Sequence, residues 1–195
     1  MELDLICKKA IKVVKEVAAF MLEERARFNQ DSVQIKGKND LVSYVDITAE
    51  KMLVEGLSKI LPDAGFLTEE ATTKKENKNL FWIIDPLDGT TNFIHNLPSF
   101  GISIALANQE ELLLGVVMEP NMDECYYACK GGGAFCNQKA IKVTSNHKIA
   151  DCLFGTGFPI NNHETISNYL DITKYLVRNT RGVRRFGSAS IDLIY

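Results

Sequence analysis

The sequence predicts an α+β fold, and three features of its pattern lead to this prediction. Two amphipathic helix patterns open the chain, and short strand patterns separated by turn residues follow them up to residue 143. From residue 149 onward, strand and helix patterns alternate. Segregated helices and strands are typical of α+β structure, whereas alternating units are typical of α/β structure. We therefore expect an α+β domain over residues 1–147 and the start of an α/β domain over residues 148–195.

The composition is that of an ordinary globular protein and excludes several functional classes. The 22 basic and 25 acidic residues give a net charge of −3, so the charge balance does not favour a nucleic-acid partner. No apolar run approaches the roughly 20 residues of a membrane span, and the first residues lack the basic region of a signal peptide. The odd number of five cysteines fits reduced thiols better than disulfides. We expect a cytoplasmic protein without a membrane or nucleic-acid partner.

Both helices at the start of the chain are predicted from apolar residues at helical spacing. The first spans residues 3–28 and the second about 47–61, and each has charged residues on its remaining faces. Asp46 directly precedes the second helix, where its side chain would serve as an N-cap. Residues 34–39 between the helices are polar and rich in lysine, which indicates a hinge.

A short strand at residues 66–67 precedes two adjacent acidic residues, Glu69 and Glu70. Successive side chains of a strand point to opposite faces, so only one of these carboxylates can face a given site. Residues 71–79 are polar and rich in lysine, and we expect a surface loop or lid there.

The most informative stretch begins with a strand over residues 81–84, whose four bulky residues indicate burial on both faces. We expect this strand to break at Pro86 and Gly89, so that it delivers Asp85 and Asp88 into a turn. Two carboxylates at the rim of a core are costly to desolvate unless a cation or hydrogen bonds compensate them. The sequence therefore points to a hard divalent cation such as Mg²⁺, which prefers oxygen ligands.

The residues around these carboxylates add two further groups. The carbonyl of Leu87 could point inward beside the cation, and a short helix could begin at Gly89 and Thr90. Free backbone N–H groups at such a helix start are a ready phosphate site. Metal ligands beside a phosphate site indicate metal-assisted phosphate chemistry.

The acidic stretch shares part of its pattern with three other kinds of site. An EF-hand loop needs carboxylates at alternate positions and a glutamate at its twelfth position, and the stretch has neither. Haloacid-dehalogenase-type phosphatases carry Asp-x-Asp-Gly-Thr, one residue shorter than the Asp-x-x-Asp-Gly-Thr found here, and would use Asp85 as the nucleophile. A turn whose aspartates only cap a helix is the third alternative.

The rest of the chain reads as a meander of strands followed by alternating elements. We expect strands at 99–107, 111–118, 126–129, 133–136 and 140–143, then a strand, helix, strand and helix at 151–155, 164–177, 182–185 and 188–195. Arg181, Arg184 and Arg185 would hold an anionic substrate or a partner subunit, or else form a solvated face. The spacing of Cys125, Cys129 and Cys136 matches no common zinc site.

Four segments in order resemble the inositol monophosphatase family, the Mg²⁺-dependent, lithium-sensitive sugar and nucleotide phosphatases. They are residues 40–46, 67–70, 82–93 and 187–192, and the segment 82–93 is highly specific. The resemblance implies a layered α-β-α-β-α sandwich whose second domain is cut short here. The family's Trp-Asp-x-Ala-Ala-Gly motif, which supplies a further metal carboxylate, has no counterpart in the 195 residues.

The resemblance also implies an activity. It is hydrolysis of a small phosphomonoester, such as inositol monophosphate or fructose 1,6-bisphosphate, by a metal-activated water in a homodimeric enzyme. In this interpretation Glu69, Asp85 and the Leu87 carbonyl hold the first Mg²⁺, and Asp85 and Asp88 hold the second. A third ion would be reached by Glu69 through water.

The remaining site residues follow from the same resemblance. Thr90, polarised by Asp46, would orient the attacking water, and Glu69 would be catalytic as well as a metal ligand. Substrate would be bound by Asp88, Gly89, Thr90, Thr91, Gly187, Ser188 and Ala189.

The absent carboxylate motif leads to two further expectations. The second Mg²⁺ should bind weakly, because two nearby cations repel and each carboxylate offsets that repulsion. A catalytically impaired or regulatory member of the same fold is therefore the alternative to an active phosphatase.

Overall fold

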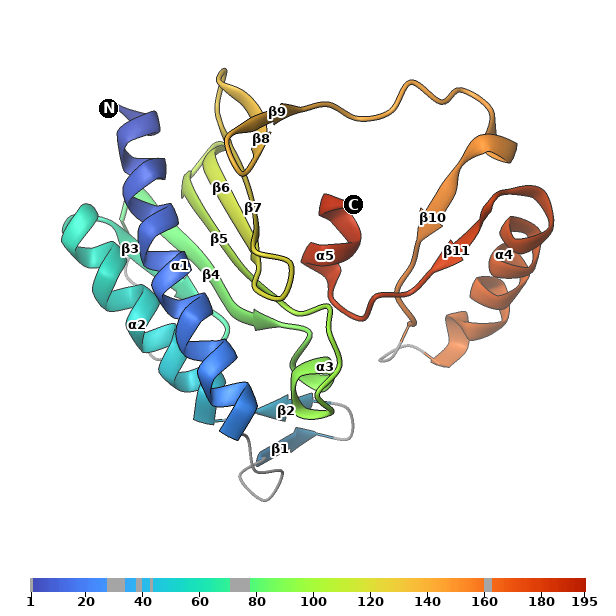
Figure 1. Cartoon of the computed structure of the whole chain (residues 1–195), viewed down its shortest axis with the longest axis horizontal. Helices are drawn as coiled ribbons and strands as arrows, with labels where there is room; N and C mark the ends of the chain where they lie inside the picture. Colours follow the sequence, from blue (N-terminus) through green and yellow to red (C-terminus); the bar gives the residue numbers. More distant parts are fainter. Residues whose placement is uncertain (1, 28–33, 38–39, 43, 71–77, 160–162) are drawn as a thin grey trace.

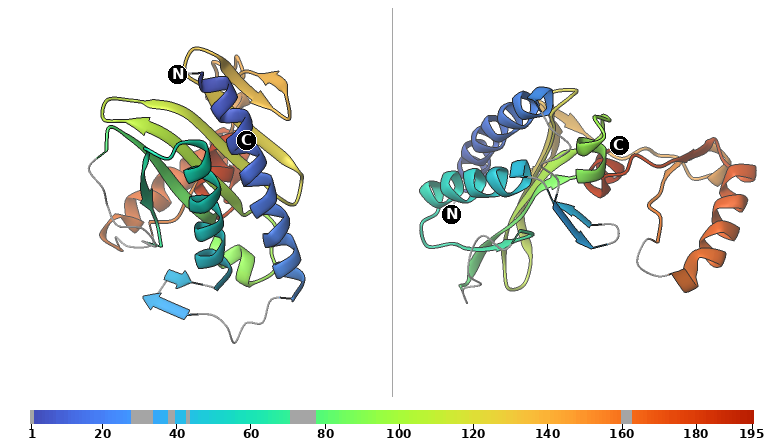
Figure 2. Two further views of the ribbon diagram at one scale, coloured as in Figure 1. Left: turned by 90° about the vertical axis from the view of Figure 1, so that its left-hand side faces the viewer. Right: turned by 90° about the horizontal axis from the view of Figure 1, so that it is seen from below.

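The structure is a computed structural model that describes residues 2–27, 34–37, 40–42, 44–70, 78–159 and 163–195. Its main body is a seven-stranded sheet in the order β3-β4-β5-β6-β7-β8-β9. Helices α1 (Leu3–Arg27) and α2 (Tyr44–Ile60) lie side by side on one face of this sheet (Figures 1 and 2). The predicted α+β fold is confirmed.

The sheet is mostly a meander, as the turn residues predict. Its strands are β3 (Gly65–Thr68), β4 (Leu80–Asp88), β5 (Gly101–Asn108), β6 (Leu112–Glu119), β7 (Glu124–Cys129), β8 (Gly133–Cys136) and β9 (Lys139–Ile141). β3 and β4 are parallel, and each later neighbour pairs antiparallel. The order places β4, which carries the acidic stretch, inside the sheet.

The hydrophobic core lies between the two helices and the sheet. Met21 of α1, Leu53 of α2 and Trp82 of β4 are fully buried there. The helices approach each other closely at Gly56, where an added Cβ would lie 2.5 Å from Cγ1 of Val13. In the described part of the chain, no helix is long and apolar enough to cross a bilayer.

The second part of the chain is a smaller unit beside the sheet. Strands β10 (Leu153–Gly155) and β11 (Gly182–Arg184) pair in parallel, and α4 (Ile166–Asn179) connects them. Short 3₁₀ turns lie at Ile149–Asp151 and His163–Thr165. The chain then returns to the main sheet, where α5 (Ala189–Ile194) contacts β5 and β6 (Figure 1). The division into domains at residue 147 stays a prediction.

Two predicted boundaries near the site are wrong. β4 continues through Pro86 to Asp88 instead of breaking at the proline. This is possible because the pairing with β5 shifts register between Asp85 and Asp88, so Pro86 has no partner residue on β5 that would need a backbone N–H. Helix α2 begins at Tyr44, so Asp46 lies in its first turn and is not the N-cap. An acidic side chain there is still favoured by the helix dipole.

The segment before α2 also differs from its prediction. Instead of a hinge, strands β1 (Gln34–Gly37) and β2 (Asp40–Val42) form an antiparallel pair. The sequence carries no clear strand signal there, because residues 34–39 are mostly polar. Most of the loop predicted at 71–79, namely residues 71–77, lies outside the described residues.

Candidate active site

The first part of the site joins the start of α2 to the turn after β4. Thr90 opens α3 (Thr90–Ile94), the short helix predicted at this point. Its Oγ1 lies 2.9 Å from the carbonyl oxygen of Leu87 and 3.3 Å from Oδ2 of Asp46. Asp46 is buried, with 3 % of its surface exposed. A hydroxyl has one proton to donate, so these two acceptors compete for it.

Asp85 lies at the centre of a group of carboxylates. The pKa of Asp85 is raised to about 8, first by burial and then by the neighbouring charges of Glu69, Asp88 and Asp46 and a hydrogen bond to Glu69. The Leu87 N–H donates to Asp85 Oδ1 over 3.2 Å. Glu69 follows the end of β3, and the parallel pairing of β3 with β4 brings it to the same edge. The geometry therefore gathers the carboxylates of Glu69, Asp85, Asp88 and Asp46 close to one another.

The donor set fits a hard divalent cation at the expected first position. It consists of two carboxylates, on Glu69 and Asp85, and the backbone oxygen of Leu87, and oxygen donors of this kind suit Mg²⁺. Among the described residues, no group of three or more His, Cys, Asp or Glu side chains is arranged to hold a metal ion. The expected first position needs only two such side chains.

The carboxylate of Asp88 lies near Asp85 and also forms hydrogen bonds with the start of the last helix. Its Oδ2 accepts hydrogen bonds from Ser188 Oγ, over 2.8 Å, and from the backbone N–H of Ser190. Ser188 is the N-cap of α5, and its side chain accepts from the N–H of Ile191. Asp88 therefore ties β4 to a segment 100 residues later, with one oxygen already engaged by serines.

Two glycines permit this close approach of the two segments. Gly89 has a φ of +94°, and a Cβ there would lie 3.1 Å from Cβ of Ser188. Gly187 has a φ of +91°, and a Cβ there would lie 2.4 Å from Nη1 of Arg185 and 2.8 Å from Nδ2 of Asn92. Both positions need a left-handed backbone without a side chain.

The structure thus gathers most of the predicted residues at one edge of the sheet. Thr91 and Ala189 are exposed in the first turns of α3 and α5. The backbone N–H of Glu70 donates to the buried carboxylate of Glu50 over 2.7 Å.

Sequence reasoning missed three residues that hold these segments in place: Glu50, Asn92 and Ser190. Asn92 Nδ2 lies 2.7 Å from both the Ser99 and the Phe186 carbonyl oxygens, and so fastens the loop before α5 to the turn after α3. Asn92 and Ser190 lie within the segments 82–93 and 187–192, so the sequence did indicate that these two residues lie near the site. Glu50 looks like any polar helix residue in the sequence.

Comparison with known proteins gives a consistent picture. A sequence model of the Inositol monophosphatase family matches residues 2–195. An inositol-1-monophosphatase of Mesorhizobium japonicum is 42% identical over 164 residues, which cover 84% of this chain and 62% of that protein. A Nus factor SuhB of Pseudomonas aeruginosa is 36% identical over 191 residues, covering 95% of this chain and 70% of the relative.

The fold is shared with solved structures. The crystal structure of the extragenic suppressor protein suhB from Bartonella henselae superimposes with a TM-score of 0.89 at 34% identity, covering 98% of this chain and 73% of the other. The chain thus spans about two thirds of the length of its relatives, and 62% of the Mesorhizobium protein.

Proposed function

Because this chain belongs to the inositol monophosphatase family, we propose that it is a Mg²⁺-dependent phosphomonoesterase that acts on a small phosphorylated metabolite. The observation that carries the proposal is the contact of Thr90 with Asp46 beside the carboxylates of Asp85 and Glu69. This arrangement sets a hydroxyl, backed by a buried acceptor, next to a donor set for a hard cation. When bound, Mg²⁺ would polarise the phosphoryl group and make a water more acidic.

Thr90 and Asp46 would control one proton. When the Leu87 oxygen is engaged by a cation, Asp46 is left as the acceptor for the Thr90 proton. The lone pairs of Thr90 Oγ1 are then free to accept a hydrogen bond from the attacking water and to orient it. Asp46 is well suited to this task because its burial holds the carboxylate in one place.

The phosphate would lie over the start of α3. The N–H groups of Gly89 and Thr90 are unused by the helix and would donate to phosphate oxygens as charge develops. Ser188 approaches from the other side, 3.1 Å from where a Cβ of Gly89 would lie, so Gly187 and Ser188 would border the bound phosphate. Thr91 and Ala189 would border the rest of the substrate.

The test is phosphate release from a panel of substrates. Inositol 1-phosphate, fructose 1,6-bisphosphate, histidinol phosphate and a nucleotide 3′-phosphate would be compared at one Mg²⁺ concentration and in a chelator. We expect Mg²⁺-dependent release from at least one of them. Release that persists in the chelator, or an aspartyl-phosphate trapped on Asp85, would contradict the proposal.

A regulatory role is the second candidate, favoured by the relative that is named a Nus factor. In that case the fold and the Asp88–Ser188 contact would be kept without turnover. The same panel separates the two candidates, because a regulatory protein would bind metal or phosphate without releasing product.

We further propose that the protein is a homodimer that acts in the cytoplasm. The large apolar side chains exposed on α4, such as Leu170 and Val177, support a self-association surface. The five cysteines, all of them free thiols, support a reducing compartment.

A further inference from the structure

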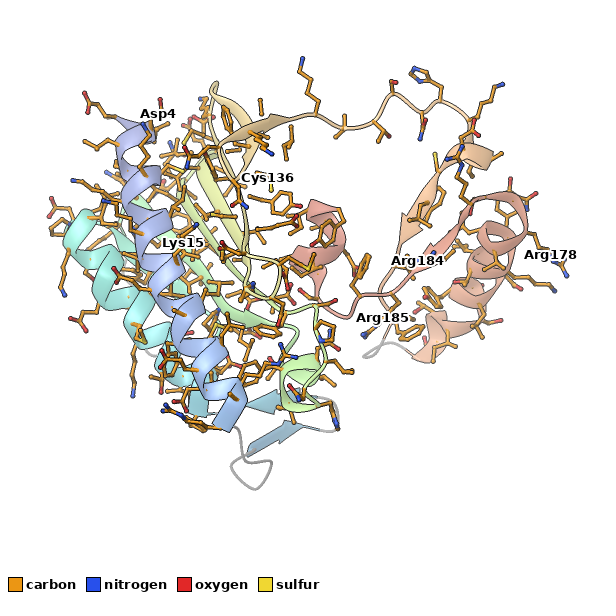
Figure 3. All side chains as sticks on the ribbon, viewed as in Figure 1. Asp4, Lys15, Cys136, Arg178, Arg184 and Arg185 are labelled. Carbon is orange, nitrogen blue, oxygen red and sulfur yellow. The ribbon has the colours of Figure 1, made fainter. Side chains whose placement is uncertain are left out.

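The boundary between α1 and β7 holds a group of three cysteines that the proposed function does not use. Cys7 comes from α1, and Cys125 and Cys129 come from β7. The two strand residues are four apart, so both side chains leave the same face of the sheet. Cys136 belongs to the opposite face, because it pairs with Tyr126, whose side chain alternates with theirs, and Figure 3 shows it on the side of the sheet away from α1.

Cys7 and Cys129 are direct neighbours. Both side chains line the same cavity, and the contact between the two thiols raises the pKa of Cys7 and lowers that of Cys129. Two neighbouring thiols become a disulfide when their sulfurs approach to ~2.05 Å.

A cavity gives a reagent access to this pair. It has a volume of about 200 Å³ and is lined by Asp4, Cys7, Lys8, Tyr127, Cys129, Gly132 and Phe135. Cys129 is half-buried, whereas Cys7 and Cys125 are each 2 % exposed. A reagent that enters the cavity therefore meets the sulfur of Cys129 first.

We propose that Cys7 and Cys129 form a thiol oxidation site, at which a low-molecular-weight disulfide is reduced and an intrachain disulfide joins α1 to β7. The Cys129 thiolate attacks one sulfur of the reagent and expels the first thiolate. Cys7 then loses its proton and attacks Cys129 in the mixed disulfide, which expels the second. One reagent disulfide thus becomes two thiols, and the protein loses two hydrogens.

The surroundings set the rate of this reaction. Burial raises the pKa of Cys7 to about 12, and burial also raises the pKa of Cys129. The thiolate is the reactive form, so we expect slow oxidation at pH 7 that accelerates as the pH rises. Intracellular disulfides are usually transient, which agrees with a slow and reversible step.

The test exposes the full 195-residue chain to cystamine and follows its mass. We expect the wild-type chain to lose two hydrogens between Cys7 and Cys129 and to yield one peptide pair linked through them. Because the bond closes a loop of more than 100 residues, Tm should rise by roughly 5–10 °C. The Cys136→Ser variant should behave as wild type, since Cys136 lies on the other face.

Two further variants make the result decisive. In Cys7→Ser and Cys7→Ala, Cys129 should stop at the mixed disulfide with one cysteamine, without the rise in Tm. Cys152, half-exposed and outside the group, shows that the reagent was active. A linkage through Cys125 instead, or modification of Cys152 with no Cys7–Cys129 bond, would overturn the proposal.

Discussion

At the residue scale, the site rests on a few side chains whose neighbours define their tasks. Thr90 touches both Asp46 and the Leu87 oxygen, and Asp88 touches Ser188 and Ser190. The residue types and their spacing in the acidic stretch predict a metal and phosphate site, which stays a prediction. The direction of the Asp88 carboxylate was not predictable, because its partners lie 100 residues away.

Thr90→Ala should reduce turnover far more than it weakens Mg²⁺ binding. Thr90 is assigned to the water and not to the cation, and loss of such proton-transfer assistance typically costs about 10²–10⁴-fold. Turnover measured across a Mg²⁺ titration checks this, with Thr48→Ala as the control because that hydroxyl only bonds the Tyr44 carbonyl. A shifted titration midpoint with unchanged turnover at saturation would show that the assignment is wrong.

The pKa of Asp85 gives a prediction for the metal-free protein. Its folded-state pKa of about 8 lies above the ordinary value of 3.8, so the folded state binds more protons between these pH values. The associated stabilisation is complete below pH 4 and is lost as the pH rises through 8. Urea unfolding in a chelator should therefore show a stability decline toward pH 8 that Asp85→Asn reduces. Equal slopes in both proteins would contradict the raised pKa.

At the element scale, apolar spacing was sufficient to predict the helices and the meander. Local rules failed where tertiary pairing decides the outcome. Pro86 stays within β4 because the register shift against β5 removes the need for its missing N–H. The β1–β2 pair formed from a polar segment with no periodic signal. Both cases depend on partners that local sequence does not contain.

The contact between α1 and α2 gives a prediction opposite to helix propensity. Gly56→Ala should stabilise an exposed helix by about 1 kcal/mol. Here the new Cβ would lie 2.5 Å from Val13, whose branched side chain is stiff, so we expect a net loss of about 1–3 kcal/mol. Chemical unfolding would measure it, with Gly115→Ala as the control because an added Cβ there would lie at ordinary contact distance, 3.9 Å, from the Ile104 carbonyl oxygen.

Val13→Ala should rescue Gly56→Ala, since it removes the obstructing methyl groups. If the double variant is less stable than the sum of the two single changes predicts, the close approach at Gly56 does not limit the packing of these helices.

At the scale of the whole molecule, the site is assembled from segments that are distant in the sequence. β3 and β4 supply the carboxylates, α2 supplies Asp46, and the loop before α5 returns from the smaller unit to close the edge (Figure 1). The order of these motifs was readable from the sequence, and their convergence followed only from the family resemblance. Nothing in local periodicity indicates that residue 188 meets residue 88.

The exposed apolar surface of α4 leads to a prediction about association. Leu170, Ile172, Tyr175 and Val177 are each more than half exposed, and the helix packs mainly against β11 and the preceding turn. Sedimentation velocity should show concentration-dependent self-association of the 195-residue chain. Leu170→Glu with Val177→Glu should abolish it, while Asn168→Asp should not. A monomer at all concentrations would rule out this surface.

The central claim is tested most directly by phosphate release from wild type and Asp85→Asn over a range of Mg²⁺ concentrations. Asp85 lies among Glu69, Asp88 and Asp46, so its loss should remove the cation and reduce Mg²⁺-dependent release by at least about 10–100-fold. Circular dichroism should show an intact fold, and Asp63→Asn, an exposed turn residue, should release phosphate like wild type. If Asp85→Asn kept more than about a tenth of the wild-type turnover, where loss of a ligand costs at least 10-fold, the proposed metal site would be wrong.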